Sequence, residues 1–160
     1  MKVIFCDVDG VLNDTTKTYE VDDKRVRRLS KLVRKTNAKV VLSSNWRLVY
    51  TLYKQHQPLH PSQKMAIKKL LFLFKLHHIE IYDITPTIGY GPESRPLEIK
   101  RWITMNHPDS YVIFDDEIFW KWDTLKDHVI TTSQTFNNEW HAGLNDEHIE
   151  KALYILEGIE

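Results

Sequence analysis

Short apolar runs alternate along this chain with longer stretches in which apolar residues recur at helical spacing. The runs predict strands at residues 3–6, 38–42, 79–84, 111–114 and 128–131. The helical stretches predict helices at residues 23–36, 48–56, 61–76, from 94 onward, 118–125 and 145–157. Polar segments rich in turn residues predict loops at 14–20, 85–92 and 132–142.

Strands that alternate with helices imply a parallel sheet covered on both faces. We therefore expect an α/β fold, a Rossmann-like three-layer sandwich around a five-stranded parallel sheet. The length of 160 residues suits a single domain, 1–160. Right-handed crossovers bring the carboxyl ends of all the strands to one edge, where ligands of such folds bind.

Acidic residues follow the first strand directly. Asp7 and Asp9 stand one residue apart, and Gly10 then permits a sharp turn. Two carboxylates this close repel each other unless a cation lies between them, and oxygen ligands of this kind suit Mg²⁺. An aspartate can also attack phosphorus and form an aspartyl phosphate. The alternative is a pair of solvated turn aspartates, but acids seldom end a buried strand without a function.

Two further strands also end in polar side chains. Ser43 and Ser44 follow the second strand, and a hydroxyl there can donate to a phosphate oxygen. Asp115 and Asp116 follow the fourth strand. Taken alone, those acids fit a helix N-terminus equally well, because the helix dipole favours negative charge there. Together with the acids after the first strand, they favour a metal site.

The sequence DVDGVLN at residues 7–13 resembles the first motif of the haloacid dehalogenase (HAD) superfamily, most of whose members are phosphohydrolases. Combined with LSSNWR at 42–47, it is similar to the HAD domain of Swiss Army Knife RNA repair proteins. A Gly-Leu pair before the last helix, Gly143-Leu144, fits the same family. The resemblance covers nearly the whole chain and implies a HAD-like fold without a large cap.

The resemblance also implies roles for the acids and a Mg²⁺ cofactor. Asp7 would be the nucleophile and Asp9 the general acid and base. The metal ligands would be Asp7, Asp9 through its backbone carbonyl, Asp115 and Asp116. Asp116 has a second possible role, which is to hold the cation of the third motif.

The resemblance also implies a hydroxyl and a cation that bind the phosphate, and for each the sequence offers two candidate residues. For the second motif, the position directly after the apolar run favours Ser43, whereas the spacing to Trp46 favours Ser44; we prefer Ser44 and retain both. For the third motif, Arg95 at a helix start fits best, with Lys100 as the alternative.

Substrate contacts are predicted at three residues in the first two motifs. These candidates are Asn13, Trp46 and Arg47. A salt-bridged arginine at a helix start is an equally good interpretation of Arg47. The expected substrate is a phosphorylated compound such as a nucleotide or a nucleic-acid end, because short insertions leave the site open.

Composition bears on the cellular location of the chain and on its binding partners. Lys and Arg together number 22, as do Asp and Glu, and net neutrality argues against strong non-specific nucleic-acid binding. A single cysteine, Cys6, excludes an internal disulfide and favours the cytoplasm. The chain begins directly in its first strand, so we expect no signal peptide. The densest apolar run, 70–74, is too short for a membrane span, and no obligate protein partner is indicated.

Two non-enzymatic functions compete with a phosphatase. A phosphoryl-accepting receiver module also uses clustered aspartates and Mg²⁺, but its acidic pair is adjacent and its acceptor lies on a middle strand. Here the spaced pair comes first and the adjacent pair fourth, which favours the hydrolase. A non-catalytic interaction module that retains the fold is the other alternative.

Overall fold

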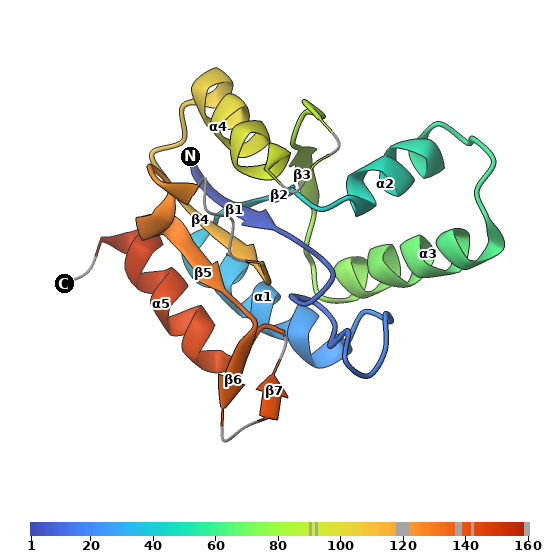
Figure 1. Ribbon diagram of the computed structural model, residues 1–160, viewed down its shortest axis with the longest axis horizontal. Helices are drawn as coiled ribbons and strands as arrows, with labels where there is room; N and C mark the ends of the chain where they lie inside the picture. The colour runs from blue at the N-terminus through green and yellow to red at the C-terminus, as the bar shows by residue number, and fades with distance from the viewer. Residues whose placement is uncertain (90, 92, 118–121, 137–138, 142, 159–160) are drawn as a thin grey trace.

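A parallel sheet forms the centre of the molecule (Figure 1). The computed structural model describes residues 1–89, 91, 93–117, 122–136, 139–141 and 143–158. Five strands lie in the order β3-β2-β1-β4-β5, and every pairing between them is parallel. The strands are β1 (Lys2–Cys6), β2 (Lys39–Leu42), β3 (Ile81–Ile84), β4 (Ser110–Asp115) and β5 (Val129–Thr131). The predicted five-stranded parallel α/β fold is therefore confirmed.

Helices cover both faces of the sheet (Figure 1). The helices are α1 (Asp23–Thr36), α2 (Trp46–Lys54), α3 (Pro61–Leu76), α4 (Ser94–Asn106) and α5 (Asp146–Glu157). One face is covered by α1, α3 and α5 and the other by α4, while α2 packs against α3. Since α3 contributes to the main core, the α2–α3 insertion is part of the sandwich and not a separate cap. None of the described helices is both long and apolar enough to cross a bilayer.

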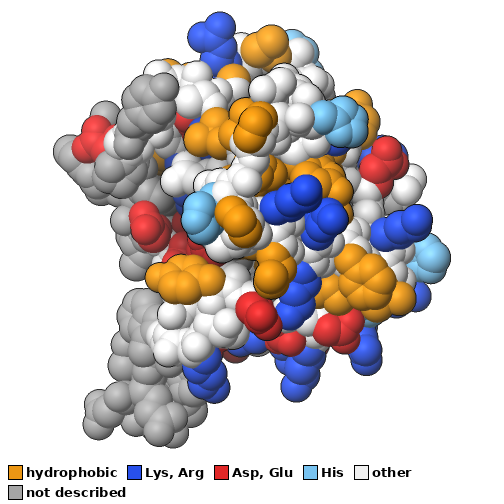
Figure 2. All heavy atoms as spheres, turned by 90° about the vertical axis from the view of Figure 1, so that its right-hand side faces the viewer, with side chains coloured by type: hydrophobic (Ala, Val, Ile, Leu, Met, Phe, Trp, Pro, Cys, Tyr) orange, Lys and Arg blue, Asp and Glu red, His pale blue; other side chains and the backbone are white. Residues whose placement is uncertain are grey.

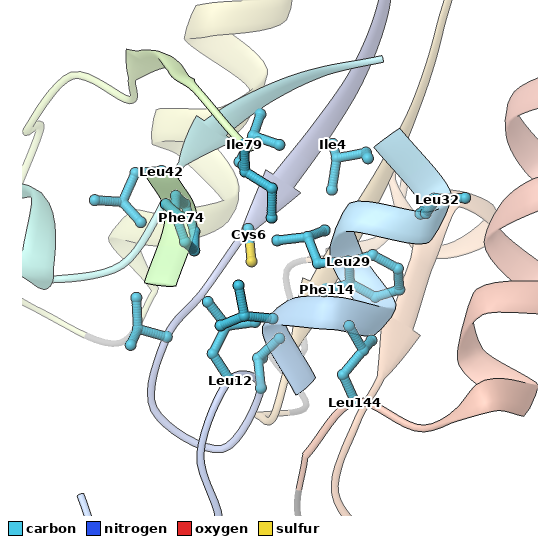
Figure 3. Packing of buried hydrophobic residues seen from close by; sticks show 14 of the residues in the cluster. Ile4, Cys6, Leu12, Leu29, Leu32, Leu42, Phe74, Ile79, Phe114 and Leu144 are labelled. Carbon is cyan, nitrogen blue, oxygen red and sulfur yellow. The ribbon is translucent and has the colours of Figure 1, made fainter. Parts of the chain in front are cut away.

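The central strand β1 supplies side chains to two cores. Because successive side chains of a strand point to opposite faces, Ile4 and Cys6 belong to the core under α1, α3 and α5. Figure 3 shows them together with Leu29 of α1 and Phe74 of α3. Val3 and Phe5 pack on the other face with α4. There the Phe5 and Trp102 rings meet edge to face, with their centroids 5.3 Å apart. Burial on both faces explains why this strand is a continuous apolar run.

Segments near the C-terminus differ most from the sequence prediction. Where a loop was predicted at 132–142, β6 (Gln134–Phe136) and β7 (Glu139–His141) form a small antiparallel hairpin. Of the helix predicted at 118–125, residues 118–121 lie outside the described part, and 123–125 form a turn. A short 3₁₀ helix, η2 (Lys126–His128), then follows. His128 belongs to η2, so the fifth strand begins one residue later than predicted, at Val129. Elements of three residues are too short to leave a periodic signal.

The N-terminus of α5 has a capping box formed by the N-cap residue Asn145 and by His148 at position N3. Asn145 Oδ1 accepts from the His148 N–H at 2.9 Å, and the Asn145 N–H donates to His148 Nδ1 at 3.2 Å. Burial lowers the pKa of His148, Lys151 and Arg28 lower it further, and Glu147 opposes them. A proton on Nδ1 would also remove the acceptor that the box needs.

Acid should therefore destabilise the fold through His148. The unfolded chain binds this proton more readily, so the His148 contribution is complete above the ordinary pKa of 6.5 and is lost as pH falls below it. The loss cannot exceed about 1.4 kcal/mol per pH unit for one proton. We expect His148→Gln, which keeps a box-forming side chain, to show a smaller decrease in unfolding free energy between pH 7.5 and 5.5 than the parent. Equal decreases in urea titrations would contradict this assignment.

Buried polar residues mark the carboxyl end of every strand of the main sheet. Because the sheet is parallel, these ends meet at one edge. The residues, none more than 4 % exposed, are Asp7, Ser43, Thr85, Asp115 and Thr132. Backbone hydrogen bonds extend the ladders past the strands here, from Asp7 to Phe114 and from Ser43 to Cys6, each at 3.1 Å. This edge therefore holds polar side chains in fixed register.

Candidate active site

The turn after β1 fixes Asp7 at the edge of the sheet. Its backbone N–H donates to the Phe114 carbonyl, and its Oδ1 accepts from the Val8 N–H at 2.8 Å. The chain then turns through Gly10, whose φ of 72° is in the left-handed region that favours glycine. Thr132 Oγ1 donates to the Gly10 carbonyl at 2.6 Å and pins the turn to the end of β5.

A cluster of carboxylates forms where β1 and β4 end. Asp7, Asp115 and Asp116 each place one oxygen within 4.8 Å of the others. Arg95, from the first turn of α4, bridges two of them: its Nη1 lies 3.0 Å from Asp7 Oδ2 and 2.8 Å from Asp115 Oδ2. The structure thus brings together acids that are more than 100 residues apart in sequence, with a cation from a third element.

Electrostatics in this cluster are dominated by burial and mutual repulsion. Burial raises the pKa of Asp115 above its usual range, and the Asp7 carboxylate adds to the effect while Arg95 opposes it. Burial, Asp7 and Asp115 raise the pKa of Asp116. Burial works against the charge of Arg95, but the Asp7 and Asp115 carboxylates outweigh it and raise its pKa. One guanidinium does not balance the three acids, so the cluster has capacity for a further cation.

Gly10 also allows Asp116 to approach the turn. A Cβ on Gly10 would lie 2.3 Å from Asp116 Oδ2, closer than any real contact. We expect Gly10→Ala to displace Asp116 and to weaken Mg²⁺ binding by about tenfold or more. The left-handed backbone should separately reduce the free energy of unfolding by about 1 kcal/mol.

Gly158→Ala is the matched control for this prediction. Gly158 also has a positive φ, of 63°, but a Cβ at this residue would have no other atom within 4 Å. It should show the backbone penalty in urea titrations without any change in Mg²⁺ affinity by calorimetry. Equal Mg²⁺ affinities for Gly10→Ala and Gly158→Ala would show that the close approach of Asp116 has no role in metal binding.

Asp9 lies outside the carboxylate cluster and is held by two donors. Asn13 Nδ2 donates to its Oδ1 at 3.0 Å, and Trp46 Nε1 donates to its Oδ2 at 3.1 Å. Asn13 is itself fixed, since its Oδ1 accepts from the Gly10 N–H and its Nδ2 also donates to the Tyr19 carbonyl. The predicted substrate contacts Asn13 and Trp46 thus orient Asp9, a role that the sequence analysis missed.

The two adjacent serines have different surroundings. Ser44 Oγ accepts from the Trp46 N–H at 3.1 Å and so stabilises the start of α2. Ser43 Oγ is buried and has no hydrogen-bond partner among the described residues. Ser43 also follows Leu42, which pairs with Cys6, so it stands in register beside Asp7. The geometry therefore favours Ser43 as the hydroxyl that donates a hydrogen bond to the phosphate. The spacing in the sequence had instead favoured Ser44.

Arg47 and Lys100 do not contact the cluster of Asp7, Asp115 and Asp116. Arg47 Nη2 pairs with Glu98 Oε2 at 2.8 Å, with both side chains buried, and its Nη1 donates to the Ser44 carbonyl at 3.1 Å. The structure thus corresponds to the salt-bridge alternative for Arg47. The buried Glu98 carboxylate also accepts from the Ile88 N–H. Lys100 has no contact with the acids among the described residues, so the cation beside them is Arg95.

A hollow of about 390 Å³ opens beside Arg95. Its walls come from the start of α2, the loop after β3 and the start of α4. Arg47, Arg95, Ser94 and Glu117 are among its lining residues. A hollow of this size next to an arginine and a carboxylate cluster can accept a phosphoryl group.

The donor set fits a magnesium ion. Asp7, Asp115 and Asp116 offer hard carboxylate oxygens within reach of a single ion, and Mg²⁺ favours such ligands together with water and phosphate oxygens. Burial raises the pKa values of Asp115 and Asp116, so an added divalent charge would stabilise these two carboxylates in the ionised form.

Comparison with protein families gives a match over most of the chain. The family described as the HAD domain in Swiss Army Knife RNA repair proteins matches residues 3–149. No curated protein and no solved structure matches the chain. A HAD domain implies a phosphatase-type hydrolase, and HAD enzymes generally use Mg²⁺. Since the match spans nearly all of the chain, this protein belongs to the family of HAD domains found in Swiss Army Knife RNA repair proteins.

Proposed function

We propose that this chain is a magnesium-dependent phosphatase that works through an aspartyl phosphate on Asp7, with a nucleic-acid end or a nucleotide as substrate. The observation that carries the proposal is the convergence of Asp7, Asp115 and Asp116 with Arg95 at the carboxyl ends of β1 and β4. This arrangement supplies a nucleophile, a metal site and a phosphate-binding cation within one small volume.

The first step transfers the phosphoryl group to Asp7. An Asp7 carboxylate oxygen attacks phosphorus, the bond from phosphorus to the leaving oxygen breaks, and Asp9 gives that oxygen a proton. Asn13 and Trp46 each occupy one lone pair of an Asp9 oxygen, so each oxygen keeps a lone pair for the proton. In the second step Asp9 takes a proton from water, the water oxygen attacks phosphorus, and the Asp7–phosphorus bond breaks to release phosphate.

The remaining residues stabilise charge on the transferred group. A bound Mg²⁺ supplies Lewis-acid stabilisation of the phosphate oxygens and would be held by Asp7, Asp115 and Asp116. Arg95 offsets part of the negative charge of Asp7 and Asp115 at rest and can donate to a phosphate oxygen, while the Ser43 hydroxyl, which has no partner among the described residues, can donate to another.

A broad phosphatase screen tests the proposal. The panel contains 3′- and 5′-phosphorylated oligonucleotides, nucleotides and sugar phosphates, each with Mg²⁺ and with chelator. We expect turnover that requires Mg²⁺ and is fastest with oligonucleotide ends or nucleotides. A preference for sugar phosphates would contradict the substrate class. Stoichiometric phosphorylation without turnover would indicate a receiver module, and no metal binding would indicate a non-catalytic protein.

A further inference from the structure

Charge is strongly segregated along a chain that is neutral as a whole. All 22 acidic residues lie outside residues 24–79, whereas fourteen of the 22 Lys and Arg residues lie inside that segment. The segment includes β2, α2, α3 and all of α1 after its first residue, Asp23. The zero net charge of the whole chain therefore combines a strongly basic segment with acidic remaining parts. A basic surface next to a phosphatase site is suited to bind a polyanion.

A groove adjoins the candidate general acid on this basic side. It has a volume of about 580 Å³ and lies between the loop before α1 and the N-terminal half of α3. Tyr19, Trp46 and Met65 are among its walls, and we call it the α3 groove. Tyr19 and Met65 are 69 % and 72 % exposed, which is unusual for such large apolar side chains.

Hydrogen bonds connect the α3 groove directly to Asp9. Trp46 donates its Nε1–H to Asp9 Oδ2, and the Tyr19 carbonyl accepts from Asn13, which also donates to Asp9. The Trp46 ring thus contacts the proposed general acid directly, and Tyr19 is linked to it by its backbone carbonyl through Asn13. A leaving group that departs toward Asp9 would extend into this groove.

An exposed stripe continues from the groove along α3. Met65, Phe72 and Leu76 are more than half exposed and recur at helical spacing. Lys68 and Lys69 lie between them in sequence. At 1.5 Å per residue, Met65 and Phe72 are separated by about 10 Å along the axis, enough for about two stacked nucleotides. Figure 2 shows Lys, Arg and His side chains, and some Asp and Glu side chains, interspersed with hydrophobic ones across the face that includes α2 and α3.

We propose that the α3 groove and the α3 stripe bind a single-stranded nucleic acid whose terminal phosphate lies at Asp7. The base of the terminal nucleotide stacks in the groove against Tyr19 and Trp46, and the next bases lie on Met65 and Phe72. Lys68 contacts the phosphate backbone of the strand. Among the described residues, Lys68 forms no ion pair that this contact would have to break. Lys69 pairs with Glu20 through two exposed side chains, which is a weak contact that a phosphate can replace.

Apolar platforms interleaved with cations favour this occupant. Bases of any sequence stack on aromatic and apolar side chains, while lysines follow the phosphates. α2 and α3 contain no acid that would repel a strand. The proposal rests on the proposed function for the position of the terminal phosphate, but strand binding can be measured without turnover.

Two exposed methionines provide a matched comparison. Met65 lines the α3 groove, whereas Met105, 68 % exposed, lines a second groove of about 600 Å³ between α2 and α4. The readout is kcat/KM for a phosphorylated octanucleotide divided by kcat/KM for p-nitrophenyl phosphate. We expect Met65→Ser and Tyr19→Ala each to lower this ratio by about tenfold, in keeping with the loss of one stacked base. Met105→Ser should leave it unchanged. A decrease for Met105→Ser alone would overturn the assignment.

Binding of an unphosphorylated, labelled octanucleotide tests the inference independently of catalysis. Fluorescence anisotropy should give an affinity that falls with salt, for RNA, for DNA or for both, and comparison of the two identifies the natural strand. Lys68→Gln should reduce the slope of log K against log salt by about 0.7, while Lys35→Gln on α1 should not. No binding of either strand, or equal slopes for the two variants, would overturn the inference. If the strand binds but no substrate is turned over, only the proposed function fails.

Discussion

Replacement of Asp7 by asparagine should abolish metal-dependent phosphatase activity. The amide keeps the size of the side chain but cannot attack phosphorus, and it removes one ligand from the carboxylate cluster. Loss of a covalent nucleophile reduces kcat by on the order of 10³-fold or more. The measurement is Mg²⁺-dependent hydrolysis of the best substrate from the screen, with urea titration to show that the variant is folded.

Asp127→Asn is the control for charge alone. Asp127 is exposed in η2, before β5, and so lies at the opposite edge of the sheet from the acids. It should retain the activity of the parent. Unchanged turnover in Asp7→Asn would show that another group attacks phosphorus and would end the nucleophile assignment.

Replacement of Glu98 by leucine should cause the largest loss of stability. The Glu98 carboxylate pairs with Arg47 at 2.8 Å, with the two side chains 1 % and 4 % exposed. Removal of one partner leaves a buried charge without compensation, which costs about 3–5 kcal/mol. Arg47→Met should cost a similar amount, because among the described residues Glu98 then keeps only the Ile88 N–H as a hydrogen-bond partner.

The double variant separates charge from packing. Because a buried pair replaced by apolar side chains is often neutral, Glu98→Leu with Arg47→Met should recover most of the stability lost by either single change. Urea titrations of the four proteins give the coupling free energy directly. If each single change costs less than about 1 kcal/mol, as in an exposed ion pair, the pair does not stabilise the edge of the sheet.

The sequence alone was sufficient for the sheet and for the acids at its edge. Each strand except the third is a nearly continuous apolar run, and Asp7 and Asp115 end two of these runs, so parallel topology alone brings them together. β3 also emerged from its alternating pattern, although it begins later than predicted, at Ile81. These features depend on local patterns and on general rules of chain connection.

Side-chain contacts between elements were beyond the reach of the sequence. Arg47 and Glu98 are 51 residues apart, and neither position reveals that the other is its partner. Spacing also favoured Ser44 over Ser43, because nothing in the sequence shows that the Ser44 hydroxyl accepts from the Trp46 N–H at the start of α2. The roles of Asn13 and Trp46 on Asp9 likewise depend on a turn whose shape only coordinates show.

Chemical trapping at Asp7 is the most direct measurement of the central claim. The enzyme is quenched during turnover with Mg²⁺ and substrate, reduced with borohydride, digested and analysed by mass spectrometry. An acyl phosphate at Asp7 would be reduced to homoserine, so we expect homoserine at position 7 only when Mg²⁺ and substrate are both present. Turnover with unmodified Asp7, or with the modification at another aspartate, would contradict the aspartyl-phosphate mechanism.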